Sequence, residues 1–529
     1  MAQAATPAFP APQVGATAEV ERIDPVRMIA FLAMCFGMFM AFLDIQVVSA
    51  SLAEIQAGLA ASSDEITWVQ TAYLMAEVVA IPLSGFLSRA LGTRIMFAGA
   101  AAGFTVASLM CGLSTSMEQM IVWRALQGFI GGGMVPTVFA SAYSIFPRSR
   151  MSIITPMIGL VATLAPTVGP TVGGYLTDAF SWHWLFFINI MPGLVVTIAA
   201  ITLIDFDRPD FSLFEHFDWI GLIFMALFLG ALEYVLEDGP RYDWFEDPTI
   251  AFAAAVSAAA AVIFFARVLL ARQPIVDLRA FADRNFALGS AFSFVLGIGL
   301  YGLTYLYPIY LGQIRGHNAL MVGQTLFVSG VAMFLTAPLV GRLVTRTDPR
   351  LMLSFGFAVV ALSNWQVTYL TKDWDFWQLM VPQILRGFGM MFAIVPITNI
   401  SLGTLPPERL KNASGLFNLT RNLGGAVGLA GLNTVLDKRI DLHLARLHDS
   451  VTWARQPVIE TLNGFAARIP GSNAQNVALK QLFLFTRQQG IVMAFADVFL
   501  LLCLLFAAFS IFVWFMRRPP PVAVGVEAH

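Results

Sequence analysis

Three charged residues lie inside stretches of the sequence that are otherwise apolar: Asp44, Glu77 and Arg124. A charge in the hydrocarbon of a bilayer is costly, so each of these side chains needs a partner or a water-filled cavity. Asp44 and Arg124 each lie about six residues from the predicted outer end of their stretch, which is about 9 Å along an α-helix. We therefore expect these two side chains to lie at the same depth and to form an ion pair.

An ion pair of this kind could carry a proton. The arginine favours the charged form of the carboxyl group, whereas removal from water favours the protonated form. A conformational change that alters this balance would make Asp44 take up or release a proton. The alternative is a permanent salt bridge with a structural role.

Glu77 lies near the middle of the apolar stretch 66–88. A carboxylate at that depth suits proton transfer or the recognition of a cationic ligand. The alternative is a protonated side chain that is hydrogen-bonded to a neighbouring helix. We expect a substrate cavity lined by Glu77, Gln127, Gln46 and Tyr73.

Other intramembrane charges are first expected to have structural roles. Arg421 would bond backbone carbonyls or close the inner end of the cavity, and Asp497 and Glu233 would help helices pack or lie near an interface. Arg386 belongs to a segment, 385–396, that partly repeats the arginine, glycine and proline pattern of the segment that contains Arg124. Such a repeat suggests two similar halves, since transporters are often built from repeats.

The composition is that of a membrane protein. Of the 529 residues 57% are hydrophobic and 12% are charged, against about 25% charged in soluble proteins. The net charge of −2 gives no indication of a nucleic-acid partner, and the three cysteines lie in apolar stretches, unlike those of a disulfide framework or a metal site. No GxxxxGK[ST] loop is present, so we expect an ion gradient and neither nucleotide nor any other cofactor.

Fourteen apolar segments have about the length that spans a bilayer. They are 28–50, 66–88, 94–114, 118–145, 151–176, 182–204, 217–236, 249–270, 285–310, 320–341, 351–370, 375–400, 412–436 and 489–515. Lys and Arg concentrate in cytoplasmic loops. With the N-terminus inside, eighteen of them fall on the inner side and three in short outer loops, which predicts fourteen spans with both termini in the cytoplasm.

The predicted fold is an all-α membrane protein with two six-helix bundles and two inserted helices. A segment between the last two spans is too polar for a bilayer, and we expect it to form an external hairpin. The predicted boundaries are 1–27 for a disordered cytoplasmic tail, 28–204 for the first bundle, 205–284 for the inserted helices, 285–515 for the second bundle, 437–488 for the hairpin and 516–529 for a second cytoplasmic tail.

The segment 157–176 carries small residues at helical spacing together with two prolines. Small residues let two helices approach closely, and prolines bend a membrane helix. These features predict a tightly packed helix with a hinge. The residues are Gly159, Ala162, Pro166, Gly169, Pro170 and Gly173.

Taken together, the segments resemble the fourteen-span drug:proton antiporters of the major facilitator superfamily, EmrB/QacA type, and the Gram-negative EmrB branch most closely. The resemblance covers nearly all of 28–515. LDIQVVSASLAEI (43–55) resembles the span 1 motif that contains the family's aspartate, here Asp44. RALQGFIGGG (124–133) resembles the span 4 motif, whose arginine, here Arg124, is implicated in proton coupling.

Two more motifs extend the resemblance. GFLSRALGTR resembles the loop 2–3 motif of the superfamily, with Ser88 in place of its usual acidic residue. APTVGPTVGGYL resembles the antiporter motif of span 5, which marks exporters rather than importers. The matching residues are Gly85, Arg89, Gly92 and Arg94 in the first, and Gly169, Pro170, Gly173 and Gly174 in the second.

The resemblance implies proton-coupled export of drugs or other small amphiphiles from a bacterial inner membrane by alternating access. It also implies a periplasmic adaptor protein and, through it, an outer-membrane channel, with the hairpin 437–488 as a docking surface; the alternative is a lid without a partner. A second hypothesis keeps the fold but assigns fatty acids, lysolipids or a metabolite as substrates, with the intramembrane arginines as anion partners. A lipid-modifying enzyme is disfavoured, because no histidine lies in the core of a span, so that we expect no catalytic site.

Overall fold

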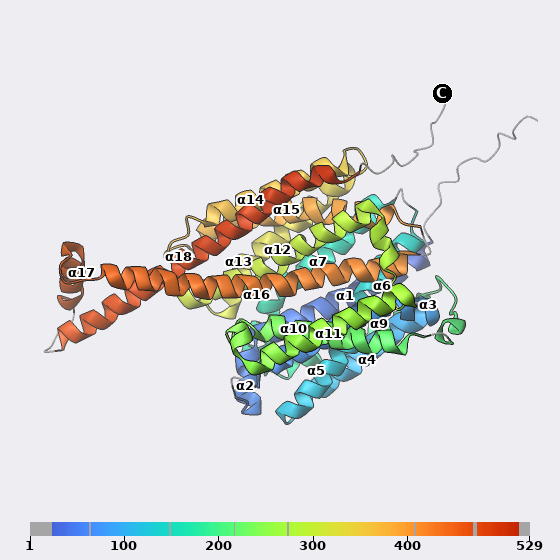
Figure 1. The fold of residues 1–529 in the computed structure, drawn as a ribbon, viewed down its shortest axis with the longest axis horizontal. Helices are drawn as coiled ribbons and strands as arrows, with labels where there is room; N and C mark the ends of the chain where they lie inside the picture. The colour runs from blue at the N-terminus through green and yellow to red at the C-terminus, as the bar shows by residue number, and fades with distance from the viewer. Residues whose placement is uncertain are drawn as a thin grey trace, which may run out of the picture.

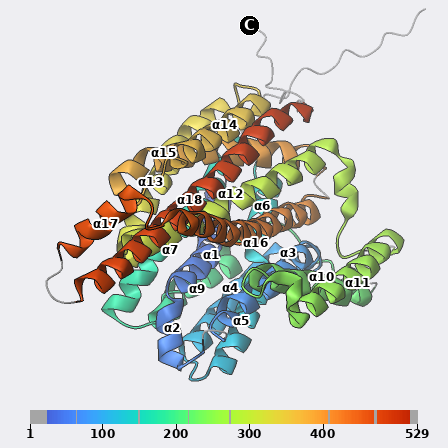
Figure 2. The ribbon, with the colours of Figure 1, turned by 60° about the vertical axis from the view of Figure 1, so that its left-hand side comes forward.

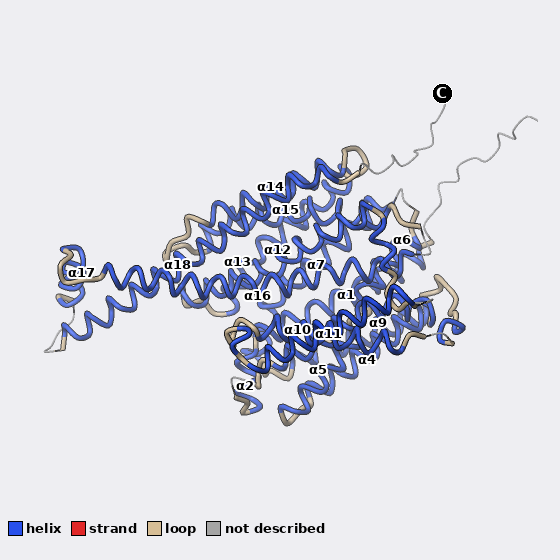
Figure 3. The backbone as a smooth tube through the Cα atoms, in the orientation of Figure 1, coloured by secondary structure: helices blue, strands red, loops and turns tan. Residues whose placement is uncertain are grey.

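A computed structural model describes residues 24–62, 65–147, 150–215, 217–271, 274–406, 409–468 and 473–517. Within these ranges the chain forms helices and loops and no strand, as the predicted all-α fold requires (Figure 3). The predicted tails are 1–27 and 516–529, and of these residues 1–23 and 518–529 lie outside the described part of the chain.

Long helices or helix pairs occupy the ranges of the fourteen predicted spans. They are α1 (Pro25–Ala50), α3 (Trp68–Ala90), α4 (Gly92–Gly112), α5 with α6 (Met117–Gly131 and Met134–Ile145), α7 (Met151–Ala179), α8 with α9 (Trp184–Phe187 and Ile190–Leu203), α10 (Trp219–Asp238), α11 (Pro248–Leu270), α12 (Arg284–Arg315), α13 (Ala319–Leu343), α14 (Pro349–Val367), α15 (Phe376–Gly403), α16 (Leu410–Ser450) and α18 (Ala474–Phe512). Two shorter helices, α2 (Leu52–Leu59) and α17 (Gln456–Ala466), lie between them.

Among the described residues, eleven of these segments are long and apolar enough to cross a membrane. The other three are α7, α14 and α16, and each packs between helices of the eleven: α7 against α1 and α13, α14 against α15 and α18, and α16 against α3 and α12. Helix α16 is less apolar because it carries Asn418, Arg421 and Asn422 toward the interior of the bundle, where polar side chains find partners.

Six of the long helices begin directly after an aspartate. In each case the aspartate side chain accepts a hydrogen bond from a backbone N–H of the first turn, which would otherwise lack a partner. This explains why the predicted starts of these segments agree closely with the structure. The six caps are Asp24, Asp218, Asp247, Asp283, Asp348 and Asp375.

The helices form two groups that meet along a long interface. Helices α1 to α9 pack with one another, and so do α12 to α16 with α18 (Figures 1 and 2). The groups meet where α7 contacts α13 and α15, and where α16 contacts α3 and α6. Helices α10 and α11 pack against each other, and α10 also contacts both α3 and α16, so it lies across the edge of this interface.

Helices α16 and α18 project beyond the rest of the bundle, and α17 lies at the tip of the projection (Figure 1). The sequence placed the end of one span at 436 and the start of the next at 489. Instead α16 continues without a break to Ser450 and α18 begins at Ala474, so each arm of the projection continues a helix of the bundle. Apolar residues at the tip support it: Leu462 of α17 packs with Leu482 of α18.

Candidate functional site

The structure brings Asp44 of α1 and Arg124 of α5 together. The guanidinium Nη1 of Arg124 lies 2.6 Å from the carboxylate Oδ2 of Asp44, and the two residues are 0% and 1% exposed. The Nε of Arg124 donates a second hydrogen bond, 3.0 Å long, to the backbone carbonyl of Val69 in α3. Removing one partner of a buried pair leaves an uncompensated charge and costs about 3–5 kcal/mol, so this contact holds α1, α3 and α5 together.

Two amide side chains complete the surroundings of Asp44. Gln127 and Asn189 donate hydrogen bonds to its Oδ1 atom, at 3.1 Å and 2.7 Å. Gln127 in turn accepts a bond of 2.8 Å from Arg124. An ionised carboxylate only accepts hydrogen bonds, and every bond made to Asp44 here comes from a donor, so the arrangement suits the charged form.

Asn189 is a site residue that the sequence analysis missed. It precedes α9 and also donates a hydrogen bond of 3.1 Å to the hydroxyl of Ser108 in α4. Ser108 donates in turn to the carbonyl of Phe186. The signal was an asparagine inside the apolar stretch 182–204, but neutral amides were singled out only in the two segments that contain Asp44 and Arg124.

Tyr73 and Gln127 belong to this buried network and do not line the main cavity. The ring centre of Tyr73 lies 4.2 Å from the guanidinium carbon of Arg124, at cation–π distance, and its side chain is fully buried. Gly128 explains how α5 comes so close: a Cβ atom there would collide with the backbone carbonyl of Tyr73. Enclosing the arginine therefore takes both side chains away from the space where a substrate could bind.

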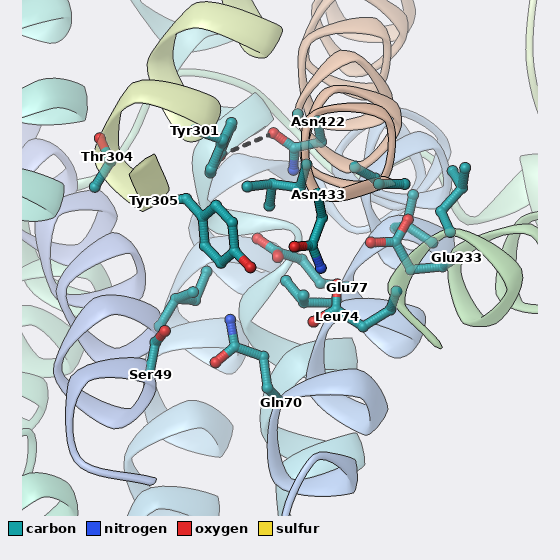
Figure 4. Close-up of a pocket in the computed structure, with 18 of the residues that line it drawn as sticks. Ser49, Gln70, Leu74, Glu77, Glu233, Tyr301, Thr304, Tyr305, Asn422 and Asn433 are labelled. Atoms are coloured by element: carbon teal, nitrogen blue, oxygen red, sulfur yellow. Dashed lines mark hydrogen bonds between the residues drawn. The ribbon is translucent and has the colours of Figure 1, made fainter. Parts of the chain in front are cut away.

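A cavity of about 290 Å³ lies between α1, α3, α10, α12 and α16 (Figure 4). Gln46 and Glu77, which the sequence assigned to a substrate cavity, both line it. The structure adds Glu233 of α10, for which the sequence suggested only a packing or interfacial role. Tyr301 and Asn422, joined by a hydrogen bond of 3.3 Å, form part of the opposite wall.

The other intramembrane charges lie outside this lining. Arg386 donates to the hydroxyl of Thr304 at 2.9 Å, and Arg421 donates to the side chain of Asn418 rather than to backbone carbonyls. Both arginines are buried, and within the described residues neither has a carboxylate at ion-pair distance. Asp497 of α18 accepts from His443 of α16 at 2.7 Å and so joins the two arms at the base of the projection.

The loop 2–3 motif lies where α3 meets the start of α16. A Cβ atom on Gly85 would lie 3.0 Å from the backbone carbonyl of Lys411, so the glycine permits this close approach. Gly92 has φ +76°, a left-handed conformation that favours glycine. Arg89 donates to the carbonyl of Gly85 at 3.4 Å, and Arg94 pairs with the exposed Asp205 at 3.3 Å.

Asp207 supplies an acidic group next to Ser88, the position where the motif usually has one. Its carboxylate accepts two hydrogen bonds of 2.8 Å from the backbone and side chain of Thr93, and it pairs with Lys411. Lys411 also donates to the carbonyl of Ser88 at 2.9 Å. The two helix groups are therefore linked at this end by a charge that comes from the connection after α9.

The span 5 motif packs α7 against α1 just after Asp44. A Cβ atom on Gly173 would lie 2.8 Å from the carbonyl of Val47, and one on Gly169 would collide with Gln46. Pro170 and Gly174 are buried beside them, whereas the side chain of Pro166 lies outside the described part of the structure. On its other face, Gly159 lies against Ile394 of α15, so α7 contacts both helix groups.

Comparison with known proteins agrees with this architecture. Residues 34–429 match the family model of the Major Facilitator Superfamily. The chain is 40% identical to "Colistin resistance protein EmrB" of Acinetobacter baumannii, over 92% of this chain and 96% of that protein. It is 28% identical to "Multidrug export protein EmrB" of Escherichia coli K12, over 94% and 96%.

Two further matches are informative. "Fatty acid resistance protein FarB" of Neisseria gonorrhoeae is 30% identical, over 94% of this chain and 97% of that protein. The crystal structure of the human organic anion transporter MFSD10 (TETRAN) matches with a TM-score of 0.57 and 12% identity, over 91% of this chain and all of that one, which shows a shared fold. The resemblance seen in the sequence is thereby confirmed: the chain is a multi-pass membrane protein of the major facilitator superfamily and belongs to its EmrB family of export proteins.

Proposed function

We propose that this protein exports small amphiphiles in exchange for protons, and that Asp44 is the residue that carries the proton. The observation that supports this most strongly is the buried network around Asp44, which takes its donors from two separate places, α5 and the start of α9. A movement of α1 relative to either would remove donors from the carboxylate while it remains away from water. Loss of donors under those conditions favours protonation.

Alternating access follows from the two helix groups. Lys411, Asp207 and Ser88 hold the groups together at one end, and the cavity lies about 15 Å or more away along α3, at the rise of an α-helix. In the predicted orientation the linked end is cytoplasmic, so this arrangement corresponds to an outward-facing state. Rocking of the groups about α7, which contacts both, would close the outer end and open the linked, cytoplasmic end.

The substrate would bind in the cavity. Its walls combine apolar side chains such as Leu74, Leu236 and Leu429 with amides and carboxylates, a surface suited to molecules that are part apolar and part polar. The names of the relatives refer to colistin, to several drugs and to fatty acids.

Fatty-acid export is the second candidate, and the similarity to FarB favours it. A carboxylate substrate needs a cation, and Arg386 and Arg421 are the buried arginines without an acidic partner in the described residues. Neither lines the cavity, however, and Arg124 is already bound to Asp44. The cavity as it stands therefore favours amphiphiles without a negative charge.

We place the protein in the inner membrane with both termini in the cytoplasm, on the basis of the Lys and Arg distribution. The projection of α16, α17 and α18 would then extend into the periplasm. We propose that it contacts a periplasmic adaptor protein and, through it, an outer-membrane channel, as the EmrB resemblance implies. The exposed Trp453 near the tip is suited to such a contact, since aromatic residues are enriched in protein interfaces.

Transport by the purified protein in proteoliposomes would test the proposal. Vesicles with an imposed pH gradient are given a fluorescent lipophilic cation, and its accumulation is followed with and without the proton exchanger nigericin. We expect accumulation that requires the gradient and stops when nigericin removes it. Accumulation at the same rate without a pH gradient would contradict proton coupling.

A further inference from the structure

We propose that the inserted helix α10 forms one wall of a binding site for amphiphiles that carry two or more positive charges. The site consists of Glu77 of α3 together with Glu233 and Glu237 of α10, and all three line the cavity. The inference rests on the proposed function, because it specifies the substrate class of the cavity. It gives α10, the first of the two helices that separate the halves of the chain, a role in recognition.

The first support is that two of these carboxylates, Glu77 and Glu233, are buried and have no partner among the described residues. Glu77 is 4% exposed and Glu233 is 6% exposed, yet neither makes a hydrogen bond or ion pair with any residue that the structure describes. Burial of an unpaired carboxylate is costly. A helix-packing role would give each acid a partner on the neighbouring helix, as Asp44 has in Arg124.

The second support is the direction and spacing of the acids. Figure 4 shows Glu77 and Glu233 around one space beside Asn433, with Tyr305 and Gln70 on its other sides. Glu237 follows Glu233 by four residues, so the two share one face of α10. Acids from two different helices thus border the same cavity.

The third support is the rest of the lining. None of the described residues that line this cavity is Lys, Arg or His, so the lining supplies no positive charge beside its three acidic groups. The Oε1 atom of Gln70 is a buried acceptor without a hydrogen-bond partner among the described residues, and an ammonium group could donate to it. The ring of Tyr305 offers a face for a cation, and the leucines of the walls would contact the apolar part.

The number of positive charges on the preferred ligand distinguishes this site from a general drug pocket. Carboxylates that share an enclosed space repel one another, and a single positive charge offsets only part of that repulsion. A ligand with two or more charges, spaced along an apolar body, can approach Glu77 and the α10 pair at once. The site therefore favours such a ligand over a monovalent cation of similar size.

Binding to the full-length protein in detergent tests this directly. Titration calorimetry compares dequalinium, a dicationic amphiphile, with tetraphenylphosphonium, a monocation, and with laurate. We expect the Kd of the wild type for dequalinium to be about tenfold or more lower than its Kd for the monocation. Laurate should bind more weakly than both cations. Tighter binding of laurate, or equal binding of the two cations, would overturn the proposal.

Variants assign the preference to α10. The double variant Glu233→Gln with Glu237→Gln should lose the preference for dequalinium, whereas Glu246→Gln, an exposed residue outside the cavity, should keep it. Retention of the full preference in the double variant would overturn the proposal. Asp44→Asn should also keep the preference, so a failure of proton coupling and a failure of this site give different results.

A measurement on the wild type avoids dependence on the folding of the variants. Carbodiimide labels accessible carboxyl groups, and peptide mass spectrometry locates the label. Dequalinium should reduce labelling of Glu233 and Glu237 and leave that of Glu246 unchanged. Equal labelling with and without dequalinium at saturating concentration would contradict binding at this site.

Discussion

Asn189 donates a 2.7 Å hydrogen bond to the Asp44 oxygen, Oδ1, that the ion pair with Arg124 leaves free. The carboxylate is therefore held from two sides, by Arg124 and Gln127 of α5 at Oδ2 and Oδ1, and by the residue before α9 at Oδ1. A change in the position of α9 would therefore alter the hydrogen bond from Asn189 to Asp44 without any movement of Arg124. We regard Asn189 as a positioning residue for the proposed proton site.

Replacing Asn189 should weaken coupling while leaving the ion pair in place. Asn189→Ala removes one hydrogen bond to a charged group, typically about 1.5–3 kcal/mol, and we expect proton-driven transport to fall by about tenfold or more. Ser108→Ala removes the other partner of Asn189 and a bond to the Phe186 carbonyl, but no bond to Asp44, and should have a smaller effect. Transport assays in proteoliposomes measure both, and equal effects of the two changes would contradict a direct role of Asn189 at Asp44.

Neutralising Lys411 should loosen the end where the helix groups are linked. Lys411→Met removes the ion pair with Asp207 and the bond to the Ser88 carbonyl. Spin labels at the exposed positions Ser144 and Thr345, one in each group, should then report longer distances in pulsed electron resonance.

The matched control for this link is Asp205→Asn. It removes the pair with Arg94, which is more exposed and should contribute about 0–1 kcal/mol. The two label distances should therefore stay as in the wild type. A shift in this control as large as that in Lys411→Met would contradict a specific role for the link.

Gly173→Ala should separate α7 from α1. Alanine in place of a helical glycine normally stabilises by about 0.5–1 kcal/mol, but here its Cβ atom would lie 2.8 Å from the Val47 carbonyl. We expect a lower unfolding temperature and slower transport. Gly99→Ala in α4 is the control, because nothing lies within 4 Å of the added atom, and it should be neutral or stabilising in the same thermal melt. Equal behaviour of the two variants would contradict close α7–α1 packing.

Removing the tip of the projection should abolish drug resistance in cells but leave transport by the purified protein intact. A variant in which a short Gly-Ser linker replaces 451–473, which contains α17, should transport normally in proteoliposomes. The reason is that no described residue of this segment lines the cavity. In whole cells, resistance to the exported compound should be lost if the projection contacts an adaptor. Full resistance in cells that produce the shortened protein at wild-type levels would contradict the docking role.

The pairing of Asp44 with Arg124 could be predicted because two opposite charges in apolar segments lie at equal depth. The third donor to Asp44 could not be predicted in that way, because Asn189 carries no charge and its role depends on how α9 begins. The same limit applies to Asp207, which follows α9 and reaches Lys411 only after the chain has folded.

Which face of a helix meets the cavity was the least predictable feature. Tyr73 and Glu77 lie one turn apart on α3, yet Tyr73 covers Arg124 and Glu77 lines the cavity. Both were expected in the lining because hydropathy gives the depth of a residue in a span but not its direction. The sequence pattern after 436 is that of an amphipathic helix, but its unbroken continuity with the preceding span was not predicted, since a helix that leaves the bilayer keeps its backbone hydrogen bonds while its composition becomes polar.

Proton release by the purified protein on addition of substrate tests the central claim most directly. A pH-sensitive dye in weakly buffered detergent solution follows proton release after dequalinium is added to the wild type and to Asp44→Asn, in which the amide oxygen can still accept from Arg124. We predict release from the wild type and none from the variant, with dequalinium binding retained in both. Undiminished release from Asp44→Asn would contradict the assignment of Asp44 as the proton-coupling residue.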